Sequence, residues 1–376
     1  MKIEEIKQTC TGCGACASVC PRDCIKFEFD KEGFYYPTID KSNCIECGLC
    51  EKKCHVLNFS VPETEKTTYY GYTRDDALRH QSTSGGAFSA IAETVLENGG
   101  KVYGAYLDCK TCDLKHTSTD EVDIGELRKS KYLESYMGTT IKNIQTDIDL
   151  GRRVMFCGTP CQTAAVKKAV TDKKNLLLTV DFICHGVPSA KLFKEHMQNV
   201  LGKRSLRIIN FRSKIKGWRN IRLQMDINGS EKIKPAACDT FYYGFISMNA
   251  FLRKSCYDCK YREVHCSDIT IADFWGYRNV DPGLDDGKGL SLIVANNELG
   301  RNIVRSMHNF ELTEIDNKFS DYAYAPKDLS SGKALRDEFY RNYEKYGFEK
   351  AAKKTYMQDY AMRNIKYIIK HLMGRE

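Results

Sequence analysis

The sequence predicts two folded parts, a small N-terminal α+β unit and a larger α/β domain with a mixed sheet. Two cysteine-rich runs, at residues 10–20 and 44–54, define the first part. Patterns of strand, glycine turn, helix and strand follow residue 67, and this alternation is typical of an α/β domain. A chain of 376 residues is too long for the cysteine-rich unit alone and long enough for one or two further domains.

Eight cysteines fall in two copies of the spacing C-x2-C-x2-C-x3-C. They are Cys10, Cys13, Cys16 and Cys20 in the first run and Cys44, Cys47, Cys50 and Cys54 in the second. Bacterial two-cluster ferredoxins have this spacing, and the fourth cysteine of each run binds the other cluster. We therefore assign Cys10, Cys13, Cys16 and Cys54 to one 4Fe-4S cluster, and Cys44, Cys47, Cys50 and Cys20 to the other.

A structural zinc module is the alternative interpretation of these runs. Zinc usually uses two C-x2-C pairs at longer separation, which favours the iron-sulfur assignment. His55 follows the second run where ferredoxins usually repeat the proline seen at Pro21, but proline is not a ligand. Between the runs, apolar and charged residues alternate over residues 25–29 and Gly33 turns the chain, which predicts a hairpin. Cys24 is expected to be a small buried residue beside a cluster.

Composition narrows the classes of function. Eighteen cysteines without a signal-peptide pattern indicate a reducing, cytoplasmic location, where thiols stay free for metal. No apolar run approaches membrane-spanning length. Lys and Arg outnumber Asp and Glu by 57 to 49, but the basic residues are scattered and no nucleic-acid motif occurs, so we expect no nucleic-acid partner. An oligomer is compatible with the sequence.

We expect four segments along the chain. Residues 1–60 form the two-cluster domain, and residues 61–66, with Pro62, form a linker. Residues 67–330 form the central domain, in which strands at 68–73 and 101–107 flank a helix at 87–98. Residues 331–376 form a helical, basic tail, which we expect to dock on the protein body rather than on a membrane.

The second half of the central domain has a clear βαβ unit. A strand at 153–157, a turn, a helix at 161–170 and a strand at 176–184 follow one another. Parallel strands end on one edge of a sheet, where ligands bind, so Cys161 and Cys184 should reach the same edge. Strands at 207–212, 222–228 and 232–234, an aromatic-rich helix at 239–252 and a strand at 269–274 are predicted next. A strand, a helix and a strand follow from residue 291.

The turn Ser82-Thr83-Ser84-Gly85-Gly86 directly precedes the helix that begins at residue 87. Free amides and the positive end of the helix dipole favour an anion such as phosphate at this position. An ordinary Ser or Thr cap on the helix is the structural alternative.

Six further cysteines are dispersed through the central domain. They are Cys157, Cys161, Cys184, Cys256, Cys259 and Cys266. A C-x2-C pair and two cysteines on a sheet edge would complete the ligands of a third cluster, but scattered buried thiols explain the spacing equally well. Cys109 and Cys112 form another C-x2-C in a predicted hairpin turn, where we expect a solvent-facing pair of reduced thiols.

Several motifs in order make residues 10 to about 296 resemble the coenzyme F420 hydrogenase/dehydrogenase β-subunit family. Besides the twin runs and residues 82–86, they are Lys131-Tyr132 with Ser135, Gly158-Thr159-Pro160-Cys161-Gln162, Cys184-His185-Gly186, Cys256 with Cys259, and Asp268-Ile269-Thr270 before Asp273-Phe274-Trp275-Gly276. The resemblance implies an FAD in the central domain, which is then a flavin-binding domain, and a third 4Fe-4S cluster beside it.

The resemblance also implies roles for single residues. The flavin contacts are Ser82, Thr83, Ser84, Gly85, Gly86, Lys131, Ser135, Gly158, Thr159 and Gln162. The ligands of the third cluster are Cys161, Cys184, Cys256 and Cys259, with Cys157 and Cys266 in reserve. His185 and Asp273 are candidate general acids by position, and a hydrogen bond beside a cluster and a turn cap are their alternative roles. The basic, aromatic stretch Arg212, Lys214, Lys216, Trp218 and Arg219 either receives an anionic substrate or forms a solvated loop.

The expected function is that of an FAD-dependent iron-sulfur oxidoreductase. Its clusters pass single electrons, and FAD exchanges a hydride with a small organic substrate. An external ferredoxin and a small molecule or coenzyme F420 are the expected partners, and no glycine fingerprint supports a nicotinamide cofactor. A subunit that oxidises or reduces coenzyme F420 is the first alternative. A non-catalytic electron-transfer subunit of a larger redox complex is the second.

Overall fold

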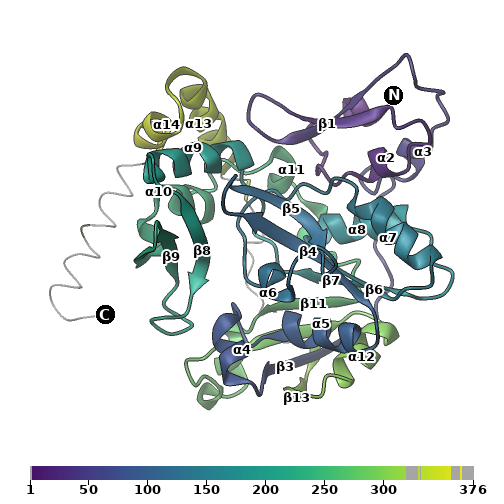
Figure 1. The fold of residues 1–376 in the computed structure, drawn as a ribbon, viewed down its shortest axis with the longest axis vertical. Helices are drawn as coiled ribbons and strands as arrows, with labels where there is room; N and C mark the ends of the chain where they lie inside the picture. The colour runs from purple at the N-terminus through teal and green to yellow at the C-terminus, as the bar shows by residue number, and fades with distance from the viewer. Residues whose placement is uncertain (1, 319–328, 331, 357–364, 366–376) are drawn as a thin grey trace.

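The computed structural model describes residues 2–318, 329–330, 332–356 and 365. Its N-terminal part is the predicted α+β unit, drawn in purple in Figure 1. The unit consists of α1 (Lys2–Glu5), α2 (Ala15–Ser18), β1 (Ile25–Phe29), β2 (Tyr35–Ile39) and α3 (Leu49–Lys52). Strands β1 and β2 form the predicted antiparallel hairpin. Residues 61–66 contain neither helix nor strand, as expected of a linker.

An eight-stranded mixed sheet forms the centre of the molecule. Its strands are β3 (Thr67–Thr73), β4 (Lys101–Asp108), β5 (Asp113–Ser118), β6 (Val154–Gly158), β7 (Leu177–Phe182), β11 (Ile269–Asp273), β12 (Ser291–Ala295) and β13 (Phe310–Ile315). They lie in the order β13-β3-β12-β11-β7-β6-β4-β5. The four strands β11, β7, β6 and β4 are parallel, and the remaining neighbours are antiparallel. The predicted mixed sheet is therefore confirmed.

Helices cover both faces of this sheet (Figure 1). On one face, α5 (Ala87–Glu97) and α12 (Glu298–Arg305) share a core with Met155 and Cys157 of β6. On the other, α7 (Thr140–Asp149) and α8 (Pro160–Ala169) share a core with Val154 and Phe156. Side chains alternate across a strand, so a strand buried on both faces is apolar at nearly every position. Short helices α4 (Asp76–Gln81) and α6 (Ile124–Leu127) complete this half.

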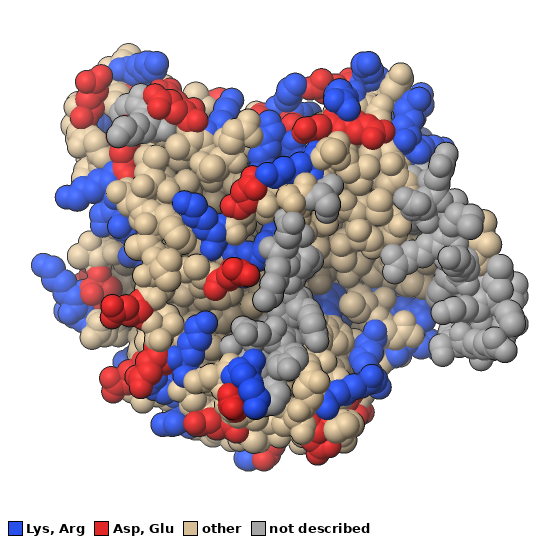
Figure 2. Space-filling model, turned by 180° about the vertical axis from the view of Figure 1, so that it is seen from behind, with Lys and Arg blue, Asp and Glu red and all other residues tan. Residues whose placement is uncertain are grey.

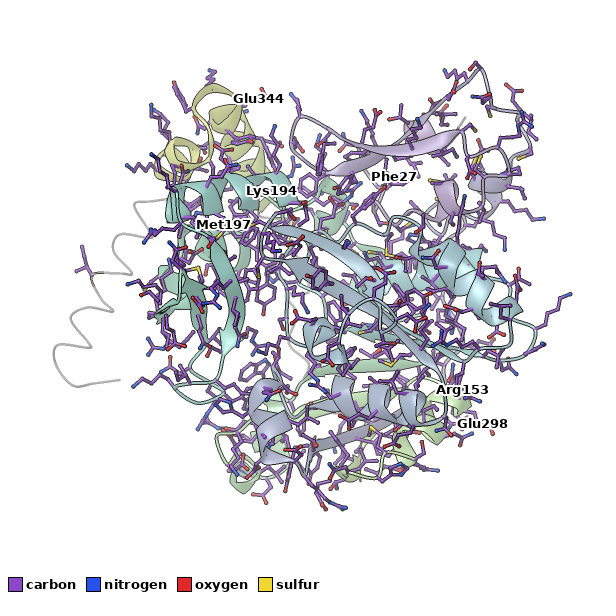
Figure 3. The ribbon with its side chains drawn as sticks, viewed as in Figure 1. Phe27, Arg153, Lys194, Met197, Glu298 and Glu344 are labelled. Carbon is purple, nitrogen blue, oxygen red and sulfur yellow. The ribbon has the colours of Figure 1, made fainter. Side chains whose placement is uncertain are left out.

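A second layer stands beside the central sheet and contains the three-stranded antiparallel sheet β8 (Leu206–Ser213), β9 (Arg222–Ile227) and β10 (Ser230–Pro235). It also contains α9 (Ala190–Leu201), α10 (Thr240–Tyr242), α11 (Lys254–Tyr257) and the 3-10 helices η1 (Ala236–Cys238), η3 (Lys260–Arg262), η4 (Trp275–Asn279) and η5 (Pro282–Leu284). Met197 of α9, labelled in Figure 3, is buried in the core of this layer. Lys194 of the same helix pairs with Asp113 of β5 at 2.5 Å and links the two layers.

The helix predicted at residues 239–252 is confirmed only in its first part, up to residue 247. After α10 the chain widens into the π-helix η2 (Tyr243–Ser247) and then leaves helical structure. Asn249 takes the left-handed conformation, with φ at 52°, which ends the helix. The aromatic residues of this segment instead fill the core between α9 and the C-terminal helices.

The C-terminal segment docks on the body, as expected. Helices α13 (Gly332–Tyr346) and α14 (Phe348–Thr355) bury Phe339, Tyr343 and Phe348 in the core that contains Phe251. Glu344 of α13, labelled in Figure 3, pairs with Lys31 in the turn of the N-terminal hairpin. The predicted helix beyond residue 356 lies outside the described residues, apart from residue 365.

Charge is mixed over the surface. On the face shown in Figure 2, basic and acidic side chains are interspersed, and no single basic stripe stands out. Within the described part of the chain, none of the helices combines the length and the apolar character needed to cross a membrane.

Candidate functional site

The fold gathers the eight N-terminal cysteines into two sets, each with three members from one run and one from the other. In the first set, burial raises the pKa of Cys16 well above its ordinary value, and the nearby Cys13, Cys10 and Cys54 raise it further. The members of the second set, Cys20, Cys44, Cys47 and Cys50, line one small cavity. Both sets have the crossed composition that the spacing predicts.

Cys24 lines the second of these cavities and is 5% exposed, with its Sγ 3.3 Å from that of Cys20. It therefore lies beside the set as a buried fifth thiol. No group of three or more His, Cys, Asp or Glu side chains among the described residues is arranged to hold a metal ion by itself. The two sets remain the predicted ligands of 4Fe-4S clusters, which bind through deprotonated thiolates.

Four cysteines of the central domain also come together. Burial raises the pKa of Cys161 well above its ordinary value, and Cys259, Cys184 and Cys256 each raise it further. Burial likewise raises the pKa of Cys184 to about 12, with Cys259 as the next contributor. These four residues, which we call the central cysteine set, come from α8, the loop after β7, α11 and the residue before η3.

The two reserve cysteines are not among the thiols that shift the pKa of Cys161. Burial raises the pKa of Cys157, and the charges that act on it are those of Asp181 and Lys131 rather than those of other thiols. Cys266 is influenced by Asp181 and Lys167. The mutual effects of Cys161, Cys184, Cys256 and Cys259 agree with the four ligands that the resemblance implies, which stay a prediction.

Local sequence explains how Cys161 is placed. Thr159 and Gln162 form a capping box at the start of α8, in which the Gln162 carbonyl oxygen accepts from the Thr159 backbone N–H at 3.0 Å. Pro160 occupies the first turn, where its missing N–H costs nothing. The cap fixes Cys161 at the edge of the sheet, directly after β6.

A cavity of about 420 Å³ opens at the same edge, where the parallel strands end. Nine of the ten predicted flavin contacts line it: Ser82, Thr83, Ser84, Gly86, Lys131, Ser135, Gly158, Thr159 and Gln162. His185, Asp273 and Cys184 line it too, so the cavity adjoins the central cysteine set.

Gly85 does not line the cavity. It packs against the neighbouring strands, where its N–H donates to Ser291 Oγ at 3.0 Å. A Cβ on Gly85 would lie 2.4 Å from the carbonyl oxygen of Gly71. Its role is to let the turn approach the sheet, and it is not placed to contact a ligand in the cavity.

The turn at residues 82–86 presents an uncapped helix to the cavity. Helix α5 begins after Gly86, and no side chain caps it. The Ser82 and Ser84 hydroxyls donate instead to the carbonyl oxygens of Leu78, at 2.8 Å, and Leu290, at 2.7 Å. The Ser or Thr cap considered from the sequence is absent among these residues. The free end of α5, with Ala87 and its neighbours, lines the cavity as an anion site requires.

Lys131 is a partly buried basic residue of the cavity lining. Desolvation lowers the pKa of its ammonium group to about 7. Its Nζ donates to the carbonyl oxygen of Arg128 and faces the cavity. A bound anion would offset the desolvation and favour the charged form of this side chain.

His116 is a cavity residue that the sequence did not single out. Its Nε2 donates to the carbonyl oxygen of Cys157 at 3.1 Å, and its Nδ1 accepts from the Ser135 hydroxyl at 2.6 Å. Burial lowers the pKa of His116 to about 4, so the ring is neutral near pH 7. A lone histidine in a strand carries no signal in the sequence, and only the fold brings it to Ser135.

The two candidate general acids have different surroundings. His185 Nε2 donates to Asn249 Oδ1 at 2.7 Å, and burial lowers the pKa of His185. Asp273, at the end of β11, forms an ion pair with Arg212 and accepts from Trp218 Nε1 at 3.2 Å. The carboxylate oxygens of Asp273 are thus engaged by other side chains.

The basic, aromatic stretch divides into buried and exposed members. Arg212 lines the cavity, while the Lys214 ammonium donates to three backbone carbonyl groups, those of Arg79, Ser84 and Lys288. Trp218 is buried and stacks on Trp275, with ring centroids 4.5 Å apart. Only Lys216 and Arg219 are exposed, so a wholly solvated loop is wrong. Arg212 Nε is buried without a hydrogen-bond partner in the described structure.

Cys109 and Cys112 lie in the predicted hairpin turn between β4 and β5, but the expected solvent-facing pair is wrong. Cys112 is buried and Cys109 partly buried, and both pack on the core of the second layer. The hairpin bends over α9 and the second sheet, which shields these thiols from solvent.

The fold and the cysteine sets define a class, that of two-part cysteine-rich proteins with a cofactor-sized cavity beside a partly buried thiol set. Residues 9–58 match the family model of the 4Fe-4S dicluster domain. Residues 151–318 match the family model of the C terminus of the coenzyme F420 hydrogenase/dehydrogenase beta subunit. These two matches confirm the predicted resemblance to the beta-subunit family over residues 151–318, behind an N-terminal dicluster domain. The matched regions are thus those of an iron-sulfur dicluster domain and of an oxidoreductase family.

Two individual proteins are similar to parts of the chain. An iron-sulfur subunit of the CoB–CoM heterodisulfide reductase of Methanocaldococcus jannaschii is 48% identical over 59 residues, which cover 12% of this chain. The match spans only 9% of that curated relative. A chain from the F420-reducing [NiFe] hydrogenase complex of Methanosarcina barkeri aligns with 18% identity and a TM-score of 0.45, covering 78% of this chain and 92% of that one.

Proposed function

We propose that this protein is an FAD-dependent iron-sulfur oxidoreductase, which passes electrons between ferredoxin-type 4Fe-4S clusters and an organic substrate through FAD. One observation carries the proposal. The cavity that predicted flavin contacts line also reaches Cys184, a member of the central cysteine set. A third cluster bound there would lie directly beside a cofactor in the cavity.

The residues present fit an FAD. The cavity of about 420 Å³ lies in the range of small-molecule sites, roughly 300–1,000 Å³. Its lining combines apolar side chains with the open N-terminus of α5 and the Lys131 ammonium, both of which favour the phosphates of the cofactor. The unpartnered Nε of Arg212 offers a further donor toward an anionic group.

Bound FAD supplies the exchange between one-electron and two-electron chemistry. The chain's own residues hold and orient it. Lys131 and the amides of α5 bind anionic groups, and His116, kept neutral by burial, orients the Ser135 hydroxyl. Both candidate general acids are engaged by neighbouring side chains, Asp273 by Arg212 and Trp218 and His185 by Asn249.

The family match favours a second candidate, a subunit that oxidises or reduces coenzyme F420, because the description of the family names this coenzyme. Both candidates use the same cavity and the same clusters. They differ in the molecule that exchanges a hydride with the flavin.

Cofactor content tests the proposal. Full-length protein purified without oxygen and supplied with FAD should contain about twelve irons and one FAD per chain. A content of about eight irons would show that no third cluster is bound. Failure to bind FAD would overturn the proposal. Rapid anaerobic bleaching of the flavin by reduced coenzyme F420 would select the second candidate. Bleaching by reduced ferredoxin, followed by reoxidation by an organic acceptor, would select the first.

A further inference from the structure

A buried arginine joins the N-terminal domain to the central cysteine set. Arg253 is 1% exposed and lies three residues before Cys256. Its side chain enters the N-terminal domain, where Nε donates to the carbonyl oxygen of Cys10 at 2.7 Å. Nη2 donates to the carbonyl oxygen of Tyr35 at 2.9 Å and to Cys10 Sγ at 3.8 Å. The Arg253 guanidinium therefore contacts Cys10, while its backbone belongs to the segment that holds Cys256 and Cys259.

Glu134 balances the charge of this arginine. It is 4% exposed, forms an ion pair with Arg253 Nη1, and accepts from the Tyr35 backbone N–H at 3.2 Å through Oε2. The guanidinium also lies over the Tyr36 ring, 4.2 Å from its centroid. A buried ion pair is weak evidence for a contribution to stability, because desolvation offsets much of its attraction. Its position at a cysteine sulfur suggests another role.

The repeat of the cysteine runs provides an internal comparison. Gly12 and Glu46 occupy the same position of the two runs, and both adopt the left-handed conformation, with φ at 68° and 52°. The turn therefore tolerates a residue with a Cβ. A Cβ on Gly12, however, would lie 2.8 Å from Glu134 Oε1 and 2.9 Å from Arg253 Nη1. The first run is thus built to receive the Arg253–Glu134 pair.

The same segment of the chain makes a second contact with the N-terminal domain. The Tyr261 hydroxyl forms a hydrogen bond of 2.7 Å with Nδ1 of the buried His55, whose Nε2 lies 3.1 Å from Thr11 Oγ1. Residues 253–261, which include Cys256 and Cys259, are therefore fixed to the Cys10 side of the N-terminal domain. Cys47, from the other N-terminal set, is exposed.

We propose that Arg253 is a positioning residue, which raises the reduction potential of the cluster bound by Cys10, Cys13, Cys16 and Cys54 and holds that cluster next to the central cysteine set. This inference rests on the proposed cluster assignment. A positive charge and an N–H donor at a cluster sulfur stabilise the more negative, reduced state. Transfer between the two clusters moves one electron, with no bond made or broken. The set with Cys44 and Cys47 is then the outer one, which exchanges electrons with the external partner.

The test is an anaerobic redox titration of the full, reconstituted chain, monitored by electron paramagnetic resonance. A Cys13→Ser variant identifies the signal of the inner N-terminal cluster. Arg253→Met combined with Glu134→Gln removes the pair without leaving a buried charge, and E134Q alone leaves the arginine. We expect the inner cluster's equilibrium constant for reduction to fall about tenfold in the double variant relative to E134Q, because the charged donor at the Cys10 sulfur is lost.

A matched control separates this effect from docking. Arg336 and Glu32 form another buried ion pair at the domain junction, with Arg336 Nε donating to the carbonyl oxygen of Leu252 at 2.8 Å. R336M combined with E32Q should leave all the midpoint potentials unchanged. Arg253→Lys should restore part of the shift.

An inner-cluster potential in R253M/E134Q equal to that in E134Q, with iron content intact, would overturn the inference and leave the proposed function standing. An equal shift in the control would also overturn it, because the effect would then come from docking. If the C13S variant gave the same resonance signals as the wild type, the cluster assignment of the proposed function itself would be contradicted.

Discussion

Cys161 and Cys184 come from successive parts of one βαβ unit, and their thiols lie close enough for the charge of Cys184 to raise the pKa of Cys161. The crossover places the end of β6 beside the end of β7, and Cys256 and Cys259 approach from the second layer. Cys184 also borders the cavity. This arrangement places a thiol set between the N-terminal clusters and the proposed flavin.

Replacement of Cys259 by serine tests the central set. The variant should lose about four of the twelve irons expected for the chain, because a cubane cluster requires four thiolate ligands. Iron and sulfide analysis of anaerobically purified protein measures the loss. Cys266→Ser is the matched control and should retain the full content, since Cys266 lies outside the set. Equal losses in the two variants would contradict our ligand assignment.

The lowered pKa of Lys131 leads us to expect that FAD binding depends on pH. Because burial lowers the pKa of Lys131 to about 7, the side chain is charged below that pH and neutral above it in the empty cavity. FAD affinity should therefore decrease as pH rises from 6 to 8. Flavin fluorescence titration of the apoprotein measures it.

Lys131→Met should lower FAD affinity about tenfold at pH 6, as expected for one charge-assisted hydrogen bond. It should also flatten the pH profile. Lys110→Met, in the exposed part of the β4–β5 turn, is the control and should change neither property. An unchanged slope in K131M would assign the pH dependence to another group.

The raised pKa of His196 leads us to expect that the stability of the fold depends on pH. Burial opposes its charged form, yet Asp239 and Glu349 raise the pKa of His196 to about 9. A histidine with a raised pKa contributes stability that is complete below about pH 6.5 and lost as pH rises through 9. The expected loss is on the order of 3 kcal/mol. Thermal unfolding at pH 6 and pH 9 measures it.

His196→Asn should reduce the difference in melting temperature between the two pH values. His308→Asn provides the control, because His308 is exposed and pairs only with Glu97 among the contacts described for it. A wild-type melting temperature that does not fall between pH 6.5 and 9 would contradict this account of the His196–Asp239 contact.

Gly85→Ala tests the packing of the turn that opens the cavity. The new methyl group would meet the backbone oxygen of Gly71, which cannot move without disturbing β3. We expect a loss of roughly 1–3 kcal/mol of stability, typical of overpacking, together with weaker FAD binding. Gly99→Ala, at a φ of 70° but with open space around the Cβ, carries backbone strain without a clash and should leave FAD binding intact. Equal FAD affinities in G85A and the wild type would show that this turn is not part of the flavin site.

The sequence predicted well what depends on local spacing. The spacing of the two cysteine runs is enough to predict which cysteines share a cluster, so the crossed sets follow from residues 10–54 alone. The βαβ unit predicted the meeting of Cys161 and Cys184, because the handedness and direction of the crossover are general properties of such units. The glycine-rich turn at residues 82–86 likewise indicated the start of α5.

What the sequence missed depends on contacts between distant segments. His116 meets Ser135 only when β5 is in place, and Arg253 reaches Cys10 across the domain junction, so neither residue stands in a local pattern. The π-helix at residues 243–247 ended the predicted helix early because tertiary packing overrode its local periodicity. The thiols of Cys109 and Cys112 were expected in solvent, since the layer that covers them comes later in the chain.

Flavin reduction in the Cys259→Ser variant is the most direct test of the proposed electron path. Anaerobic stopped-flow mixing of the FAD-loaded chain with reduced ferredoxin should bleach the flavin rapidly in the wild type. In C259S, with the N-terminal clusters and FAD still bound, bleaching should slow by orders of magnitude. Bleaching at the wild-type rate in that variant would show that electrons reach the flavin without the central cysteine set, and would contradict the path proposed for this protein.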